Sequence, residues 1–306
     1  MPTNNKESNF ISAVVYLQDD EAAVQPFLAA LQSQLDEHFS QYEIVCVDDC
    51  CTDGTVQAVR SYAASRLDKP LTLLHMSLRQ GVELGMNAGL DASIGDFVYE
   101  FDTAQMPYEP VLIWQAYQKA LEGNDIVSVG PAKSRAGSRL FYGLFNAASH
   151  SAYKVQTDAF RLVSRRAINR VHAISENLAY RKAAYAASGL RVASLTFEGA
   201  LRVKAPGRFG LAMDSLALYT DAGYKLSVGV SCAMLLLTLG ELAYTLFVYL
   251  SGKPIEGWTT TMFVLTMGFL GVFLILTIVL KYMSLLVDLV FKKQKYLVEG
   301  VEKIQK

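Results

Sequence analysis

Apolar runs and segments of helical periodicity alternate along the chain as far as residue 129. Five short apolar runs, rich in β-branched residues, predict buried strands, at 10–17, 42–47, 71–76, 97–101 and 125–129. Four intervening segments repeat apolar residues at helical spacing, at 21–39, 55–67, 84–92 and 110–121. Strands that alternate with helices in this way form a mostly parallel sheet covered on both faces. The pattern therefore predicts an α/β fold.

Two long apolar stretches follow in the C-terminal third of the chain. Residues 226–250 carry Glu241 as their one charge, and residues 257–280 carry no charge. Each stretch is long enough to cross a hydrocarbon core of about 30 Å as a helix. The short polar join between them predicts a two-helix transmembrane hairpin. The alternative is a buried hydrophobic hairpin in a soluble fold.

Charge around the hairpin predicts its orientation in the membrane. The join contains Lys253, whereas four lysines follow the second stretch: Lys281, Lys292, Lys293 and Lys295. The positive-inside rule therefore places the C-terminal tail and the N-terminal domain in the cytoplasm, with the protein integral to the inner (plasma) membrane. Residues 1–9 are polar and lack an apolar core, so we expect no signal peptide.

These patterns divide the chain into four parts. We expect a cytosolic domain at 1–204, an interfacial helix at 205–225, the hairpin at 226–280 and a basic amphipathic tail at 281–306. A carboxylate inside a bilayer is costly, so Glu241 is expected to face another helix, with contact to a lipid head group as the alternative. Packing of this kind predicts a homo-oligomer.

The composition narrows the class of protein. The chain has 306 residues, 28 Lys and Arg, and 29 Asp and Glu, for a net charge of −1. A nucleic-acid-binding protein usually has a basic excess, so no nucleic-acid partner is expected. Hydrophobic residues make up 52% of the chain, which excludes general disorder. The four cysteines do not follow a zinc-binding spacing.

Acidic residues follow the ends of three predicted strands, at 19–21, at 48–49 and at Asp102. In sheets of this kind ligands bind at the carboxyl ends of the strands. The first strand is not followed by Gly-x-Gly-x-x-Gly, and the chain has no Walker A motif, which disfavours dinucleotide and P-loop sites. Carboxylates can accept from ribose hydroxyls or hold a divalent cation on a diphosphate. A nucleotide sugar therefore suits this edge.

At these residues the chain resembles family 2 glycosyltransferases of the GT-A fold, and more narrowly the polyprenyl-phosphate and dolichol-phosphate sugar transferases with two C-terminal spans. Residues 42–55 are similar to the family's YEIIxVDDGSxDGT, and residues 79–96 to its RNxGxxxAxNxGxxxAxGD. Asp102 stands at the first Asp of the D-x-D element, and residues 158–165 resemble GDFRLxxR.

The resemblance implies transfer of a sugar from a nucleotide-diphosphate sugar to a polyprenyl (undecaprenyl) phosphate on the cytoplasmic leaflet, for glycosylation of a cell-envelope polysaccharide. Asp102 and Gln105 would hold Mg²⁺ or Mn²⁺, and Arg135 and Arg139 would meet phosphates through the bidentate guanidinium fork. Six residues would line the nucleotide site: Tyr16, Gln18, Asp20, Asp49, Arg79 and Gly81.

The chain departs from the family pattern at the metal motif. Ala104 replaces the second Asp of D-x-D, and Gln105 or Glu100 could compensate, Glu100 because it shares a strand face with Asp102. The departure motivates an alternative function, a catalytically weakened paralogue that acts as a scaffold for an active transferase. Three further arginines, interpreted as a solvated helix face, are left out of the site: Arg161, Arg165 and Arg166.

Overall fold

The computed structural model describes residues 6–66, 68–133, 154–174, 180–199 and 296–304, together with isolated positions within 142–147 and 229–286. The chain divides into two compact units. The first comprises Met1–Arg208 and Gln294–Lys306, and the second comprises Phe209–Lys293.

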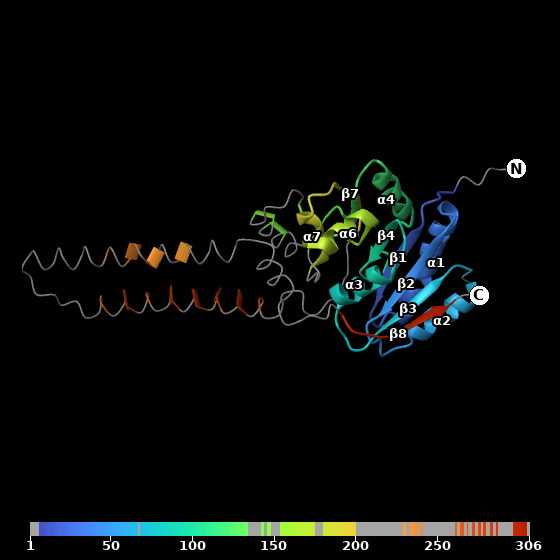
Figure 1. Ribbon diagram of the computed structural model, residues 1–306, viewed down its shortest axis with the longest axis horizontal. Coiled ribbons are helices and arrows are strands. Elements are labelled where there is room, and N and C mark those ends of the chain that lie inside the picture. The colour runs from blue at the N-terminus through green and yellow to red at the C-terminus, as the bar shows by residue number, and fades with distance from the viewer. Residues whose placement is uncertain are drawn as a thin grey trace, which may run out of the picture. The chain divides into compact units, whose positions relative to one another are not determined.

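A single sheet of eight strands, counted over the described residues, forms the centre of the first unit (Figure 1). Its strand order is β7-β5-β6-β4-β1-β2-β3-β8. The neighbouring strands β4, β1, β2 and β3 are parallel, as are β5 and β7, whereas β6 and β8 run antiparallel to their neighbours. The strands span Ile11–Leu17, Tyr42–Asp48, Leu71–Met76, Phe97–Phe101, Ile126–Pro131, Phe160–Ser164, Val192–Phe197 and Val298–Ile304, from β1 to β8.

Helices cover both faces of this sheet, which explains the uninterrupted burial of β1 and β2. On one face α1, α2 and α4 enclose the main apolar core, which includes Phe27, Tyr99 and Phe101. On the other face α3 packs against β1 and β2, and α6 packs against β6 and α7 (Figure 1). The helices span Glu21–His38, Thr55–Arg66, Val82–Ala92, Val111–Leu121, Arg165–Ile174 and Arg181–Ala187, from α1 to α4 and then α6 and α7.

The predicted α/β fold with a mostly parallel sheet is confirmed, and all nine predicted elements through residue 129 are present with small shifts at their ends. The sequence analysis did not identify β6, β7, β8, α6 or α7. The last strand, β8, pairs with β3 from a position more than 220 residues further along the chain. The sequence assigned this segment to an amphipathic tail, and in the structure it closes one edge of the sheet (Figure 1).

The second unit contains the segments predicted to span the membrane. Its described residues at 229–240 and 261–286 are helical, and the Met234 side chain packs directly on Gly271. Over the described positions, none of the helices has both the length and the apolar character that a bilayer crossing requires. Most of 226–250 and 257–280, including Glu241, lies outside the described residues, as does the interfacial segment 205–225.

Candidate active site

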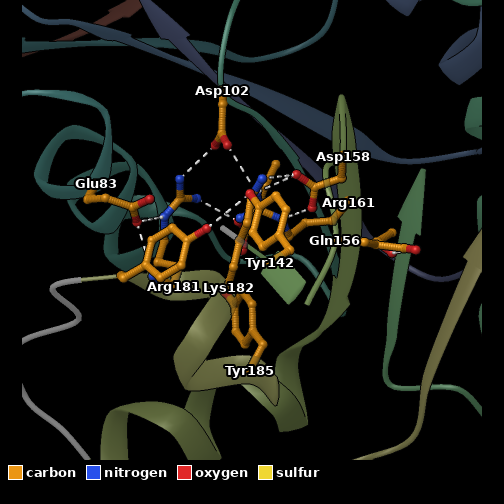
Figure 2. A network of polar contacts seen from close by, with 12 residues as sticks. Glu83, Asp102, Tyr142, Gln156, Asp158, Arg161, Arg181, Lys182 and Tyr185 are labelled. Carbon is orange, nitrogen blue, oxygen red and sulfur yellow. Dashed lines mark hydrogen bonds and ion pairs between the residues drawn. The ribbon is translucent and has the colours of Figure 1, made fainter. Parts of the chain in front are cut away.

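Asp102 follows the last residue of β4 and lies at the edge where the parallel strands end. β6 runs in the opposite direction beside β4, so it begins at this same edge and pairs Arg161 with Glu100. Arg181 is the first residue of α7. Figure 2 shows Asp102, Arg161 and Arg181 converging from these three elements. Segments distant in sequence therefore supply one cluster of charge.

Two arginines bind both acidic side chains of the β4 edge. Arg181 Nη2 donates to Asp102 Oδ1 at 2.6 Å, and Arg161 Nη2 donates to Asp102 Oδ2 at 3.0 Å. The Nη1 atoms of Arg161 and Arg181 donate to Glu100 Oε2 at 2.8 and 2.5 Å. The Tyr185 hydroxyl donates to the other oxygen of Glu100. These charge-assisted bonds fix the orientation of both carboxylates.

Further ion pairs hold Arg161 and Arg181 in place. Glu83 of α3 accepts from Arg181 Nε at 2.9 Å, and Asp158 accepts from Arg161 Nε at 3.0 Å. Lys182 forms a further ion pair with Asp158 (Figure 2). We call this set of residues the arginine network: Glu83, Glu100, Asp102, Asp158, Arg161, Arg181, Lys182 and Tyr185.

Burial within the arginine network is uneven. The side chains of Glu100 and Arg181 are fully buried, and that of Arg161 is 2% exposed. Charges removed from water in this way must be paired, since an unpaired buried charge is strongly destabilising. The side chain of Asp102 is 26% exposed, which makes it the most exposed charged group of the network.

The network also sets the ionisation of its carboxyl groups. Burial opposes ionisation of Asp102, but Arg161, Arg181 and Lys182 outweigh it and hold the pKa of Asp102 below its ordinary value. Burial likewise opposes ionisation of Asp158, and Arg161 and Lys182 again lower the pKa of its carboxyl. Both groups are therefore ionised at neutral pH, and neither is suited to store a proton for general acid catalysis.

Asp49 lies behind the predicted nucleotide wall and holds the turn that follows β3. Its carboxylate is fully buried and accepts from the backbone N–H groups of Gln80 and Gly81, each at 2.8 Å. The Tyr16 hydroxyl donates to the same carboxylate at 2.6 Å. The predicted site residues Tyr16, Asp49 and Gly81 are thus brought together. Asp49 has its bonding capacity engaged within the protein, so its observed contacts position the turn.

Gln18 and Arg79 form the exposed side of this wall. The Gln18 amide oxygen accepts from the Arg79 guanidinium in the orientation that satisfies both groups. Asp20 accepts from the Gln18 backbone N–H at 3.1 Å, and burial raises the pKa of its carboxyl. Gly81 has a φ of 87°, a backbone conformation that glycine adopts without strain. The turn thus presents Arg79 to solvent, next to the half-buried Gln18 that follows β1.

The described residues around Asp102 do not supply the ligand set that Mg²⁺ or Mn²⁺ needs. Both oxygens of Asp102 already accept from arginines, and Ala104 has no ligand atom. Gln105 is exposed and lines a shallow hollow against α1, on the face of the sheet opposite the arginine network. Mg²⁺ and Mn²⁺ need several oxygen ligands, so Asp102 and Gln105 do not by themselves fit such an ion.

One group of three possible metal ligands occurs in the part of the chain that the structure describes: Asp19, Cys51 and Asp53. These residues organise loops. Asp19 accepts from the backbone of Thr52 at 2.7 Å, and Asp53 accepts from the backbone of Thr55 at 3.0 Å, at the start of α2. This group has no connection to Asp102.

The structure also identifies network residues that the sequence analysis missed. The interpretation of Arg161 as part of a solvated helix face is wrong, because Arg161 is a buried residue of β6. One signal was available, since Arg161 interrupts the apolar run Phe160–Ser164, where an arginine requires partners. Arg181 and Lys182 carried no comparable signal. The predicted phosphate-binding residues Arg135 and Arg139 lie outside the described residues.

Comparison with known proteins finds a matching family. The family model described as glycosyl transferase family 2 matches residues 12–187, which is more than half of the chain. A protein of Synechocystis sp. named as an uncharacterized glycosyltransferase is 26% identical over 271 residues, covering 82% of this chain and 83% of its own. A prophage bactoprenol glucosyl transferase homolog of Escherichia coli K12 is 27% identical over 221 residues, covering 68% of this chain and 70% of its own.

A solved structure shares the fold of the first unit. Glucosyl-3-phosphoglycerate synthase from Mycobacterium tuberculosis, crystallised with Mn²⁺, UDP and glucosyl-3-phosphoglycerate, matches with a TM-score of 0.50. The match covers 68% of this chain and 78% of that chain at 15% sequence identity. At this identity the likeness concerns the fold, and it agrees with the GT-A architecture expected from the sequence.

Proposed function

Because the chain belongs to glycosyl transferase family 2 and is a glycosyltransferase, we propose that it moves a sugar from a nucleotide-diphosphate sugar to a polyprenyl phosphate. The observation that carries the proposal is the arginine network at the carboxyl edge of the sheet. It fixes three cationic side chains, those of Arg161, Arg181 and Lys182, around the partly exposed carboxylate of Asp102.

The proposed reaction forms one bond and breaks one. An acceptor phosphate oxygen attacks the anomeric carbon of the sugar, and the bond from that carbon to the donor diphosphate breaks with its electron pair on the diphosphate. The acceptor oxygen is already an anion, so the step requires no general base. The low pKa values of Asp102 and Asp158 are compatible with such a step. The exposed guanidinium of Arg79 would stabilise the charge that develops on the departing diphosphate.

The wall formed by Gln18, Asp20 and Arg79 is proposed to bind the nucleoside part of the donor. The exposed Arg79 supplies a guanidinium that can bind phosphate or stack on a base, and Gln18 orients it. A divalent cation belongs to the proposal as an ion carried mainly by the donor diphosphate, in the way that Mg²⁺ is commonly bound. The Mn²⁺ named with the mycobacterial enzyme supports this expectation.

The acceptor is proposed to be a lipid phosphate at the cytoplasmic leaflet. The name of the E. coli relative specifies bactoprenol, which is a polyprenol. The second unit supports a membrane location, because its described helical positions expose large apolar side chains, among them Leu236, Leu265 and Leu286. We propose that this unit forms the predicted transmembrane hairpin, that both chain ends face the cytoplasm, and that copies of the chain associate through the hairpin.

One observation favours the alternative of a scaffold. Ala104 supplies no second carboxylate, and both oxygens of Asp102 are bound by arginines. A scaffold needs neither donor binding nor turnover.

Sugar transfer into lipid tests the proposal. Purified full-length protein would receive undecaprenyl phosphate, Mg²⁺ or Mn²⁺, and labelled UDP-, GDP- and CDP-sugars in turn. We expect label in the organic phase from one donor class. A matched reaction with undecaprenol, which lacks the phosphate, should give none. If no donor yields lipid-linked label and no nucleoside diphosphate binds, the scaffold alternative replaces the proposed function.

A further inference from the structure

The C-terminal strand β8 lies next to the nucleotide wall. It pairs antiparallel with β3, from Leu71 opposite Ile304 to Met76 opposite Val298. Arg60 of α2 donates to Glu302 of β8 at 2.8 Å, which anchors the middle of the strand. The end of β3 leads into the turn that Asp49 holds. The residues just before β8 therefore lie beside this turn.

Gln80 joins the C-terminal segment to that turn. Its side-chain Nε2 donates to the Leu297 carbonyl at 2.7 Å, and the Leu297 N–H donates to Gln80 Oε1 at 2.9 Å. The Ser77 N–H also donates to the Leu297 carbonyl, at 3.1 Å. The backbone donor and acceptor of Leu297 thus fix the orientation of the Gln80 amide. This contact links positions 217 residues apart in the sequence.

The backbone of the same residue is bound to Asp49. The Gln80 N–H donates to Asp49 Oδ1 and the Gly81 N–H donates to Asp49 Oδ2, both at 2.8 Å. Gln80 is therefore held on both sides, by the C-terminal segment through its side chain and by Asp49 through its backbone. Arg79, the exposed member of the nucleotide wall, immediately precedes it.

We infer that the backbone of Leu297, just before β8, is part of the donor-binding apparatus, with Gln80 as the positioning residue through which it orders Arg79 and Gly81. The inference rests on the proposed function, because it assigns this wall to the donor nucleotide. It adds a role for the extreme end of the chain. Without the Leu297 contact the turn loses one of its two anchors, and the nucleotide must then order the turn when it binds.

Five full-length variants test this role, with binding of a nucleoside diphosphate as the readout. UDP, GDP and CDP would first be titrated into the wild-type protein, and the diphosphate that binds most tightly would then be used. Gln80→Ala removes the amide, and Leu297→Pro removes the N–H that donates to it. Each should weaken binding about tenfold, as expected for the loss of one or two ordering hydrogen bonds.

Two variants serve as matched controls. Leu297→Ala keeps the backbone N–H and C=O and should bind like the wild type. Tyr296→Phe removes the hydroxyl that donates to Asp91 at 2.9 Å, which ties the same segment to α3 without touching Gln80. It should also bind like the wild type. The double variant Gln80→Ala/Leu297→Pro should bind no more weakly than either single variant, because both remove the same contact.

Hydrogen exchange at the Gly81 amide gives a second readout that needs no ligand. We expect faster exchange in Leu297→Pro than in Leu297→Ala, because the turn that Asp49 holds opens more often. Equal exchange in these two variants, or equal diphosphate affinity in folded Gln80→Ala and wild-type protein, would overturn the inference. If the wild type binds no diphosphate, the proposed function fails, and the exchange comparison still decides whether the C-terminal segment orders the turn.

Discussion

At the scale of single residues, the arginine network depends on the position of Arg161. It is the second residue of β6, and antiparallel pairing sets it directly opposite Glu100 on β4. Its guanidinium donates to Glu100 of β4, to Asp102 just after β4, and to Asp158. The sequence shows an arginine in an apolar run, but the partners come from a strand 60 residues earlier, and local patterns do not reveal that pairing.

Acid should weaken the fold through the network carboxylates. Asp102 and Asp158 have lower pKa values in the folded protein than the ordinary aspartate value near 4. Their stabilising contribution is therefore present above about pH 4 and is lost as the pH falls towards the folded pKa values. We expect the free energy of unfolding to fall between about pH 5 and pH 2, by up to about 1.4 kcal/mol per pH unit for each proton taken up.

Thermal unfolding across this pH range would measure the effect. Asp158→Asn should flatten the pH dependence, whereas Glu37→Gln, a change to an exposed helix residue, should not. An identical pH dependence in wild type and Asp158→Asn would show that the ion pairs do not contribute in this way.

At the scale of elements, the sequence predicts the parallel half of the sheet because its signals are local. The runs that form β1 to β5 are apolar, and the helices between them are amphipathic. β8 has the opposite character, with inward and outward positions that alternate and with Glu299, Glu302 and Lys303 exposed or half-buried. Charges on an edge strand are common because they discourage pairing between molecules. Such a strand lacks the apolar run by which strands are recognised.

Close packing of α3 on the sheet depends on Gly89. A Cβ atom at this position would lie 2.4 Å from Val14 Cγ1 and 2.8 Å from Val47 Cγ2. Gly89→Ala should therefore lower the free energy of unfolding by about 1–3 kcal/mol, as overpacked cores do. Gly300→Ala on β8, where a Cβ meets no atom within 4 Å, is the matched control and should be nearly neutral. Equal unfolding midpoints for the two variants would contradict the close approach of α3.

At the scale of the whole molecule, the chain combines the α/β unit with a second unit whose described residues are helical. The C-terminal residues Gln294–Lys306 belong to the first unit, although they follow the second in sequence. The chain therefore leaves the first unit and returns to it. A sequence can predict the hairpin from hydropathy, but the return of the chain into the sheet is a tertiary event.

Membrane extraction tests the proposed hairpin. After expression, the full-length protein should remain in the membrane pellet after washing with alkaline carbonate and should be released by detergent. Release by carbonate alone would indicate peripheral attachment and would contradict a transmembrane hairpin.

We propose that the arginine network around Asp102 is the reaction centre. The most direct measurement is the rate of sugar transfer to undecaprenyl phosphate by Asp102→Asn, compared with the wild type at equal folded concentration. Glu122→Gln, a change to an exposed residue paired with Lys119, is the control. We predict a loss of at least about 100-fold for Asp102→Asn, in line with the removal of a preorganised charge, and wild-type transfer for Glu122→Gln. Transfer by folded Asp102→Asn at the wild-type rate would contradict the account.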